Sequence, residues 1–196
     1  MTRPDALLKP SLIAAACGAL MALSPAALAG DTQSYPLADA VHTVRLQGAG
    51  TALQVKTRAA SDRQLDVMAE DNFGCTLSTR MRQQDDVLVV DVIAGGWRFG
   101  PWCDPDLIVT LPEGLALDIG LENLAADIRG VYGPVNITSQ NSVIQFAGSA
   151  SGFEVSGRRA ALRLSFPPDM ARDAVKIDVG LVMSDITFDG AAPGDL

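Results

Sequence analysis

The sequence predicts an all-β protein, a right-handed parallel β-solenoid built from stacked coils of 18 residues. Apolar residues occur in pairs such as Leu117/Ile119, and a second pair, Ala126/Ile128, follows nine residues later. This unit of two pairs recurs twice at steps of 18 residues, as Val135/Ile137 with Ile144/Phe146 and as Phe153/Val155 with Leu162/Leu164. The fourth unit, Val175/Ile177 with Ser184/Ile186, follows after 22 residues, four more than the regular step. Outside the N-terminal region no segment has uninterrupted apolar residues at helical spacing. Parallel crossover connections favour the right-handed form.

Residues 1–29 are expected to be a cleaved secretory signal peptide. Arg3 and Lys9 form a basic start, an apolar stretch covers residues 11–23, and Ala-Leu-Ala at 27–29 provides a small-residue cleavage site. The apolar stretch is shorter than an ordinary membrane span, so we expect no stable membrane insertion after cleavage. The exported protein is expected to be periplasmic or secreted.

The polar segment 30–40 is expected to be a flexible N-terminus, followed by a single β-solenoid domain over residues 41–196. The first strands are expected at Val44/Leu46 and, nine residues later, at Leu53/Val55. Less regular strands should follow around Leu65/Val67, Leu77, 87–93 and 107–111. Gly95-Gly96 and Pro112-Glu113-Gly114 end the last two of these, because Gly and Pro interrupt strand pairing.

The regular coils begin at Leu117, and each should contribute two strands that face each other across a core about 10 Å thick. Two inward columns are expected, one of Ile119, Ile137, Val155 and Ile177, the other of Ile128, Phe146, Leu164 and Ile186. Gly130 with Gly148, and Asn123 with Asn141, fall at equivalent turn positions. Residues 168–174 are expected to form one helical turn that accommodates the four additional residues, and 189–196 should cap the stack.

The charge balance argues against nucleic-acid binding. Without residues 1–29 the chain has 13 basic and 22 acidic residues, a net charge of −9. Neutralising phosphates needs clustered Lys and Arg, and the only local basic group is Arg158-Arg159 with Arg163. We therefore expect no nucleic-acid partner.

Two cysteines, Cys75 and Cys103, remain after signal cleavage, and an even count in an exported protein predicts a disulfide between them. A metal or redox pair is the alternative, but the spacing is not C-x-x-C and His42, the only histidine, is distant in the sequence. Cys17 would be lipidated if the signal were a lipoprotein signal, although Ala14 is not the large aliphatic residue that such signals prefer.

Trp97, Phe99 and Trp102 form an aromatic loop beside Cys103 and include both tryptophans of the chain. If exposed, these rings would contact a sugar or a protein partner. The alternative is that they plug the end of the core next to the disulfide, because large apolar rings are usually buried.

Residues 107–166 combine a strand, the turn Leu111-Pro112-Glu113-Gly114 and apolar-x-apolar pairs separated by Gly and Asn turns. This pattern resembles the bacterial putative-adhesin family of unknown function, whose relatives include the head-GIN putative autotransporter adhesins. The resemblance spans most of the exported chain and implies a β-solenoid with an adhesin-like role. It rests on strand and turn pattern, so it assigns no functional residue.

No catalytic residue, cofactor or metal is expected. A nucleophilic triad needs a histidine beside Ser or Cys, and His42 lies at the start of the first expected strand, where a surface position is favoured. Gly-rich phosphate loops and Cys/His clusters are absent from the sequence. Calcium is an alternative at Asp104/Asp106 or Asp169/Asp173, but neither set follows a known loop spacing.

Paired carboxylates are the remaining enzymatic hypothesis. Asp118 and Glu154 should lie two rungs apart, about 9.6 Å, near the upper limit for an inverting glycosidase pair. Asp127 should point away from Asp118, on the opposite sheet. Glu154 should neighbour Lys176, and Arg163 should neighbour Asp185, which favours a solvated charge ladder.

Together these observations predict an exported cell-envelope structural or interaction module, adhesin-like and not an enzyme. Its partner would be an envelope protein or a glycan. The alternative is a carbohydrate-binding or carbohydrate-cleaving β-helix protein.

Overall fold

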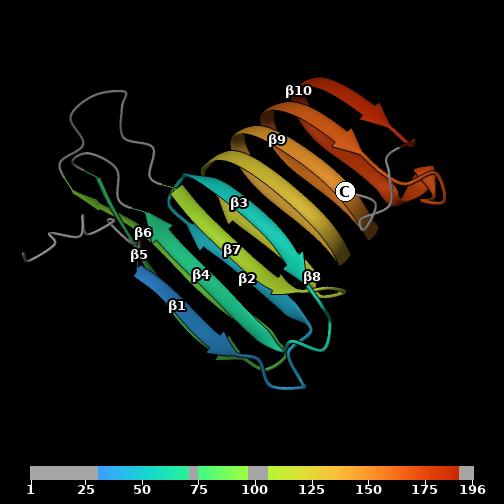
Figure 1. Ribbon diagram of the computed structural model, residues 1–196. Coiled ribbons are helices and arrows are strands. Elements are labelled where there is room, and N and C mark those ends of the chain that lie inside the picture. The colour runs from blue at the N-terminus through green and yellow to red at the C-terminus, as the bar shows by residue number, and fades with distance from the viewer. Residues whose placement is uncertain (1–30, 71–74, 97–105, 190–196) are drawn as a thin grey trace, which may run out of the picture.

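The computed structural model describes residues 31–70, 75–96 and 106–189 (Figure 1). The all-β prediction is confirmed, since the described elements are strands and one 3-10 turn, η1 (Arg172–Ala174). The strands are β1 (Asp31–Pro36), β2 (Thr43–Gly48), β3 (Thr51–Arg58), β4 (Gln64–Glu70), β5 (Cys75–Gln84), β6 (Val87–Gly96), β7 (Asp106–Pro112), β8 (Ala116–Leu121), β9 (Asn123–Ser165) and β10 (Val175–Thr187).

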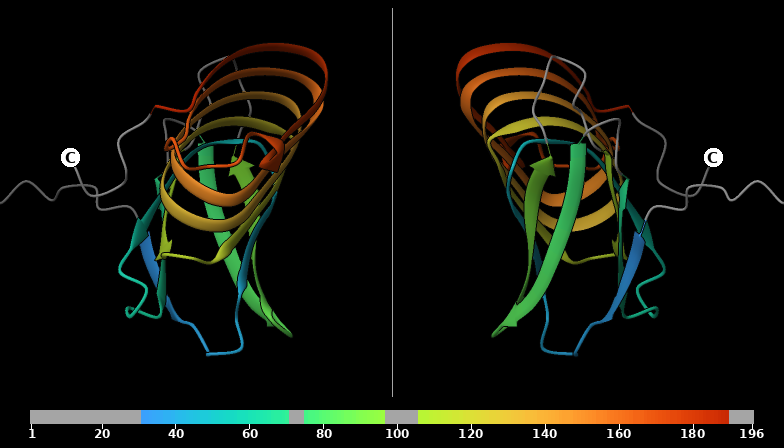
Figure 2. Two further views of the ribbon diagram at one scale, coloured as in Figure 1. Left: turned by 90° about the vertical axis from the view of Figure 1, so that its right-hand side faces the viewer. Right: turned by 90° about the vertical axis from the view of Figure 1, so that its left-hand side faces the viewer.

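All these strands belong to one sheet, in the order β1-β4-β7-β3-β9-β8-β2-β6-β5, with β10 added on β9. The sheet folds back on itself into a nearly closed, barrel-like shape, and β4 and β5 approach each other across the gap. Seen along its axis, β9 winds round the molecule in stacked loops that β10 continues (Figure 2). Each loop therefore contributes one segment to each of two opposing walls.

The 18-residue spacing of the sequence is the observed register of neighbouring loops. Ile119 of β8 is the partner of Ile137 in β9, in parallel orientation. Within β9 the hydroxyls of Thr138 and Ser156, 18 residues apart, lie 3.1 Å from each other. β10 pairs with β9 at an offset of 22, with Ile177 beside Val155, because η1 and its flanking residues occupy the four additional positions.

The two expected inward columns form the core. Ile119, Ile137 and Val155 are at most 1% exposed on one wall, and Ile128, Phe146 and Leu164 are at most 2% exposed on the other. The last rung differs, since Ile177 and Ile186 are only partly buried. Aromatic rings fill the space between the walls, with the Phe146 centroid 4.9 Å from that of Phe153 and 5.1 Å from that of Phe166.

The loops are not stacked in chain order. β2 lies between β6 and β8, and β3 lies between β7 and β9, always in parallel orientation. The loop built from β2 and β3 is thus inserted between two loops that follow it in the sequence. The alternation of apolar residues fixes which face of a strand points inward, but it does not fix which strand becomes the neighbour.

The N-terminal end of the stack also departs from the uniformly parallel solenoid expected over residues 41–196. β4 pairs antiparallel with β7, and β5 pairs antiparallel with β6. Gln84 faces Val87 across the two-residue turn of Asp85 and Asp86, where Asp85 has φ 54°. So short a connection can join only antiparallel strands, because a parallel return needs a long crossover.

Part of the segment 30–40, which its polarity predicts to be a flexible N-terminus, is a strand in the structure. Residues 31–36 form β1, which pairs antiparallel with β4 and places Tyr35 opposite Leu65. Arg63 then holds the following chain, since its Nη2 donates to the carbonyls of Ala38 (2.8 Å) and Val41 (2.9 Å).

Residues 1–29, the expected signal peptide, and most of the expected end cap lie outside the described residues. Within the described ranges, no helix is long and apolar enough to span a membrane.

Candidate interaction surface

One outer wall of the molecule carries a mostly polar surface with an apolar part formed by Met68 and Ile108, here called the polar face. It consists of the outward side chains of β1, β4, β7 and β3 with the following turn: Thr32, Ser34, Gln64, Asp66, Met68, Ile108, Thr110, Gln54, Lys56, Arg58 and Asp62. Alternate residues of a strand share one face, so the register aligns these side chains in rows. One row runs Ser34, Asp66, Thr110, Lys56 across four neighbouring strands.

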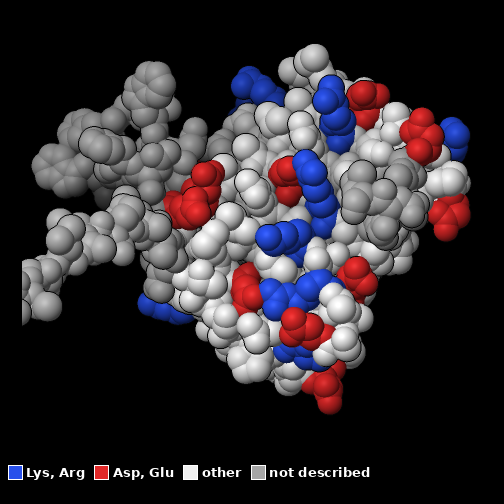
Figure 3. All heavy atoms as spheres, in the orientation of Figure 1, with Lys and Arg blue, Asp and Glu red and all other residues white. Residues whose placement is uncertain are grey.

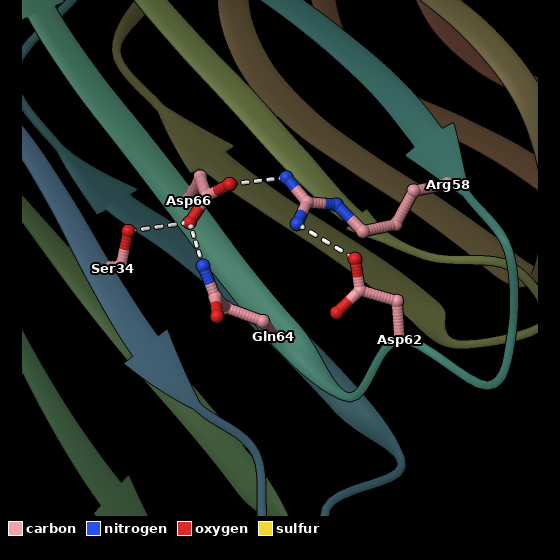
Figure 4. A network of polar contacts seen from close by, with 5 residues as sticks. All are labelled: Ser34, Arg58, Asp62, Gln64 and Asp66. Atoms are coloured by element: carbon pink, nitrogen blue, oxygen red, sulfur yellow. Dashed lines mark hydrogen bonds and ion pairs between the residues drawn. The ribbon is translucent and has the colours of Figure 1, made fainter.

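Asp66 is the centre of a hydrogen-bond network on this face (Figure 4). Its Oδ1 accepts from Ser34 Oγ and from Gln64 Nε2, each at 2.7 Å. Its Oδ2 forms an ion pair with Arg58 Nη2, and Arg58 Nη1 also contacts Asp62 Oδ2 at 3.0 Å. The network therefore ties together β1, β4, β3 and the turn between β3 and β4.

The network keeps its charged groups ionised. The hydrogen bond from Ser34, followed by those from Gln64 and Arg58, lowers the pKa of Asp66 although partial burial opposes the shift. The hydrogen bond to Asp66 in turn raises the pKa of Arg58, supported by Asp62. The Arg58 and Asp66 side chains are each 24% exposed, so the pair is accessible and yet sheltered from full solvation.

A shallow, open groove of about 520 Å³ lies on the polar face. Met68 and Ile108, both half-buried, form its apolar part, and Thr32, Lys56, Arg58, Asp62, Asp66 and Thr110 complete the lining. Acidic and basic side chains lie side by side over this region of the surface (Figure 3). The groove thus offers an apolar floor with charges of both signs at its rim.

Lys56 is the cation of this groove that is available to a ligand. Its side chain is exposed, and within the described ranges it has no hydrogen-bond or ion-pair partner. Arg129, its register partner on β9, is already engaged by Asp127, with Nε to Oδ1 at 2.9 Å and Nη2 to Oδ2 at 3.0 Å. Asp127 raises the pKa of Arg129 through this contact.

The opposite wall carries mostly paired charges. Arg45 Nε contacts Asp118 Oδ2 at 2.7 Å, and Asp91 accepts from Gln47 Nε2 at 2.8 Å while also pairing with Arg82. Glu154 is the register partner of Lys176, as the expected charge ladder requires. Asp118 and Glu154, the candidate carboxylate pair, each lie beside a cation of their own.

Several residues singled out in the sequence lie outside the described residues, namely Trp97, Phe99, Trp102 and Cys103. Cys75 begins β5 and is the register partner of Gly96, the last described residue before that aromatic segment. The disulfide between Cys75 and Cys103, and the role of the aromatic rings, therefore stay predictions.

The other candidate sites remain dispersed. His42 is exposed and precedes β2, where its backbone N–H donates to the carbonyl of Asp86 at 2.9 Å. Asp106 begins β7, whereas Asp169 and Asp173 are exposed near η1. In the part of the chain that the structure describes, no three His, Cys, Asp or Glu residues come together as metal ligands.

Sequence reasoning missed the network around Asp66. A signal was present, because polar residues alternate at 54, 56 and 58 and again at 64 and 66, and Arg58 and Asp62 are four residues apart. Nothing in the pattern connected Ser34 with these positions, since it belongs to a segment expected to be flexible.

Comparison with known proteins finds no matching family model and no matching curated protein. Among solved structures, a putative cell adhesion protein from Clostridium sporogenes is similar, with a TM-score of 0.47, 8% identity and coverage of 82% of this chain and 99% of the other. A putative adhesin from Bacteroides fragilis gives a TM-score of 0.26 at 10% identity, covering 82% and 96% of the two chains. A putative adhesin from Parabacteroides merdae gives 0.22 at 9% identity, covering 83% and 94%. The family resemblance described from the sequence remains a prediction.

Proposed function

We propose that the protein is an exported, adhesin-like interaction module of the cell envelope that acts by surface contact and not by catalysis. The polar face is the observation that carries the proposal. Its side chains stand in rows on hydrogen-bonded strands, and the network around Asp66 holds several of them in place. A surface ordered before binding loses little conformational entropy when a partner docks, which favours affinity.

We further propose that the wound strands constitute a right-handed parallel β-solenoid with an antiparallel cap formed by β1, β4 and β5. The 18-residue register between β8 and β9 and the two apolar columns support this assignment. The basic, apolar and small-residue pattern of residues 1–29 supports export to the periplasm or beyond.

The groove suggests what kind of group the partner presents. Lys56 provides an unpaired positive charge at the rim, next to the apolar surface of Met68 and Ile108. A carboxylate beside an apolar ring or chain, as found on acidic glycans and on acidic protein loops, complements both features. The partner is therefore an envelope protein or glycan that carries an acidic group.

Capture of partners from envelope extract tests this proposal. The exported protein is immobilised beside its Lys56→Gln variant and an Arg80→Gln variant, which removes an exposed cation from β5 on the other wall. We expect Lys56→Gln to weaken retention of the captured component about tenfold and Arg80→Gln to leave it unchanged. Equal retention by all three proteins would exclude the groove as the contact site.

The aromatic loop is tested in the same experiment. A Trp97→Ala/Trp102→Ala variant reports whether those rings contribute to a glycan contact, which is the carbohydrate-binding alternative. Release of soluble sugar from envelope polysaccharide by the unmodified protein, lost in Glu154→Gln, would overturn the non-enzymatic proposal.

A further inference from the structure

We propose that two copies of this chain associate end to end through β10, as a twofold symmetric dimer in which the two β10 strands pair antiparallel. This proposal is independent of the groove and concerns the C-terminal end of the stack. The other end is covered by the antiparallel strands β1, β4 and β5.

β10 is an edge strand of unusual length. It spans 13 residues, and among the described residues it pairs with β9 alone. Its second side therefore presents backbone N–H and C=O groups to any chain that can supply the complementary row. Long uncovered edges are uncommon in soluble proteins because they recruit further strands.

The last rung of the core is also incomplete at this end. Val155 and Leu164 are each 1% exposed, whereas Ile177 and Ile186, which continue their columns, are only partly buried. At the bend of β10, Leu181 is 64% and Met183 is 77% exposed. A second apolar rung placed on this one would complete both columns.

The path of β10 makes a second copy of this chain a geometrically suitable partner. Its first half, 175–179, runs along one wall against 153–157, and its second half, 181–187, returns along the other wall against 159–165 (Figure 2). A twofold axis through the bend at Gly180 and Leu181 lays the first half of one copy on the second half of the other. The two strands then run antiparallel along their whole length.

Side-chain direction restricts the register of this pairing. On the first wall residues 175, 177 and 179 pack against the core, and on the second wall residue 186 does so. Residues 182 and 184 are exposed, but their register partners Ala160 and Leu162 are buried, so the even-numbered positions stand on the inward side of this wall. Inward residues must meet inward residues, since a shift by one would turn apolar side chains outward. The possible registers are therefore those that pair an odd-numbered residue of one copy with an even-numbered residue of the other.

Charge selects one of these registers. Pairing residue 176 with residue 185 places Lys176 opposite Asp185 of the second copy, and symmetry repeats this ion pair. If the register is shifted by two residues in one direction, Asp178 of one copy lies opposite Asp185 of the other. If it is shifted by two residues in the other direction, Lys176 lies opposite Met183. Opposite charges stabilise a cross-strand pair and like charges destabilise it, so the first register is favoured.

Cross-linking of the exported protein with a zero-length carbodiimide tests the contact directly. Lys176 and Asp185 lie on opposite walls of one chain, so a Lys176–Asp185 cross-link can form only between two copies. Lys176 with Glu154, neighbours within the chain, is the internal control. We expect the Lys176–Asp185 cross-link only in the band of the dimer. The Lys176–Glu154 cross-link should occur in the bands of both the monomer and the dimer. A Lys176 cross-link to Asp195 in the monomer band would show that the C-terminal segment covers β10 and would overturn the proposal.

Charge exchange tests the register. We expect Lys176→Glu and Asp185→Lys each to raise the dimer dissociation constant about tenfold in sedimentation experiments, and the double variant to restore it. Met183→Lys, which faces Asp178 of the second copy, should lower the constant, whereas Met183→Glu should raise it. The proposal would be overturned if the protein sediments as a monomer at about 0.1 mM. It would also be overturned if none of these substitutions changes the dimer dissociation constant.

Discussion

Asn141 lies one loop after Asn123, and its Nδ2 donates a hydrogen bond to the Oδ1 of Asn123 at 2.9 Å. The two residues are 18 positions apart, so the bond joins equivalent turns of successive loops. In the same turn the hydroxyl of Ser139 contacts the carbonyl oxygens of Glu122 (3.2 Å) and Asn141 (3.1 Å). These polar contacts join the turns of neighbouring loops and so help to fix the register between the loops.

Replacement of Asn141 by Ala should lower the free energy of unfolding by about 1 kcal/mol, because one hydrogen bond between loops is lost. Urea denaturation followed by circular dichroism measures the change. Gln145→Ala is the control, since Gln145 is equally exposed but has no side-chain hydrogen bond to a described residue. Similar losses for both variants would contradict a register role for the asparagines.

Gly148→Ala should be among the most damaging single substitutions in the described part of the chain. A Cβ at this position would lie 2.0 Å from the carbonyl oxygen of Gly130, and Gly148 has φ 152°. The backbone of two stacked loops would have to separate, so we expect a loss of at least about 2 kcal/mol in unfolding free energy.

Gly114→Ala separates the steric cause from the conformational one. Gly114 has φ 83°, but a Cβ there would meet no atom within 4 Å. Only backbone strain remains, and the expected loss is about 1 kcal/mol. If Gly114→Ala were the more damaging of the two in thermal denaturation, close stacking of the loops would not explain the requirement for glycine at 148.

The network around Asp66 should make stability depend on acid pH. Because the pKa of Asp66 is lowered in the folded state, its contribution is complete above the ordinary value of 3.8 and is lost as the pH falls from there through the folded pKa. We expect the free energy of unfolding, measured by urea titration at a series of pH values, to decline over this range.

Asp66→Asn removes this contribution and should flatten that part of the pH profile. At neutral pH the variant should lose about 1 kcal/mol, since the amide keeps hydrogen-bonding capacity but not the charge that Arg58 neutralises. Asp39→Asn is the matched control, because Asp39 is exposed and its carboxylate forms no ion pair with a described residue. A profile with the same slope in Asp66→Asn as in the unmodified protein would exclude Asp66 as the titrating group.

The predicted disulfide is open to a direct chemical test. If Cys75 and Cys103 are joined, the chain without residues 1–29, denatured without reductant, should show no free thiol, and reduction should lower the unfolding free energy by about 3–4 kcal/mol. Cys75→Ser should then expose one reactive thiol at Cys103. Two free thiols in the unreduced protein would contradict the pairing and leave the aromatic segment without this covalent link.

The sequence by itself determined the strand content, the inward columns and the 18-residue register of the C-terminal half. Alternation decides which face of a strand is buried, and a constant repeat length decides which residue of the next loop lies beside it. Ile119 beside Ile137 and Asn123 beside Asn141 follow from these two rules.

Only the tertiary structure decided where the N-terminal strands lie. An apolar pattern shows which residues of a strand are buried but not which strand lies beside it, so it could not reveal that β2 and β3 are inserted between later strands, or that β1 joins β4. The network of Ser34, Arg58 and Asp66 depends on that placement, because it joins strands distant in sequence. Neighbours in this half are selected by hydrogen bonding between strand edges, which is common to all strands and leaves no periodic trace in the side chains.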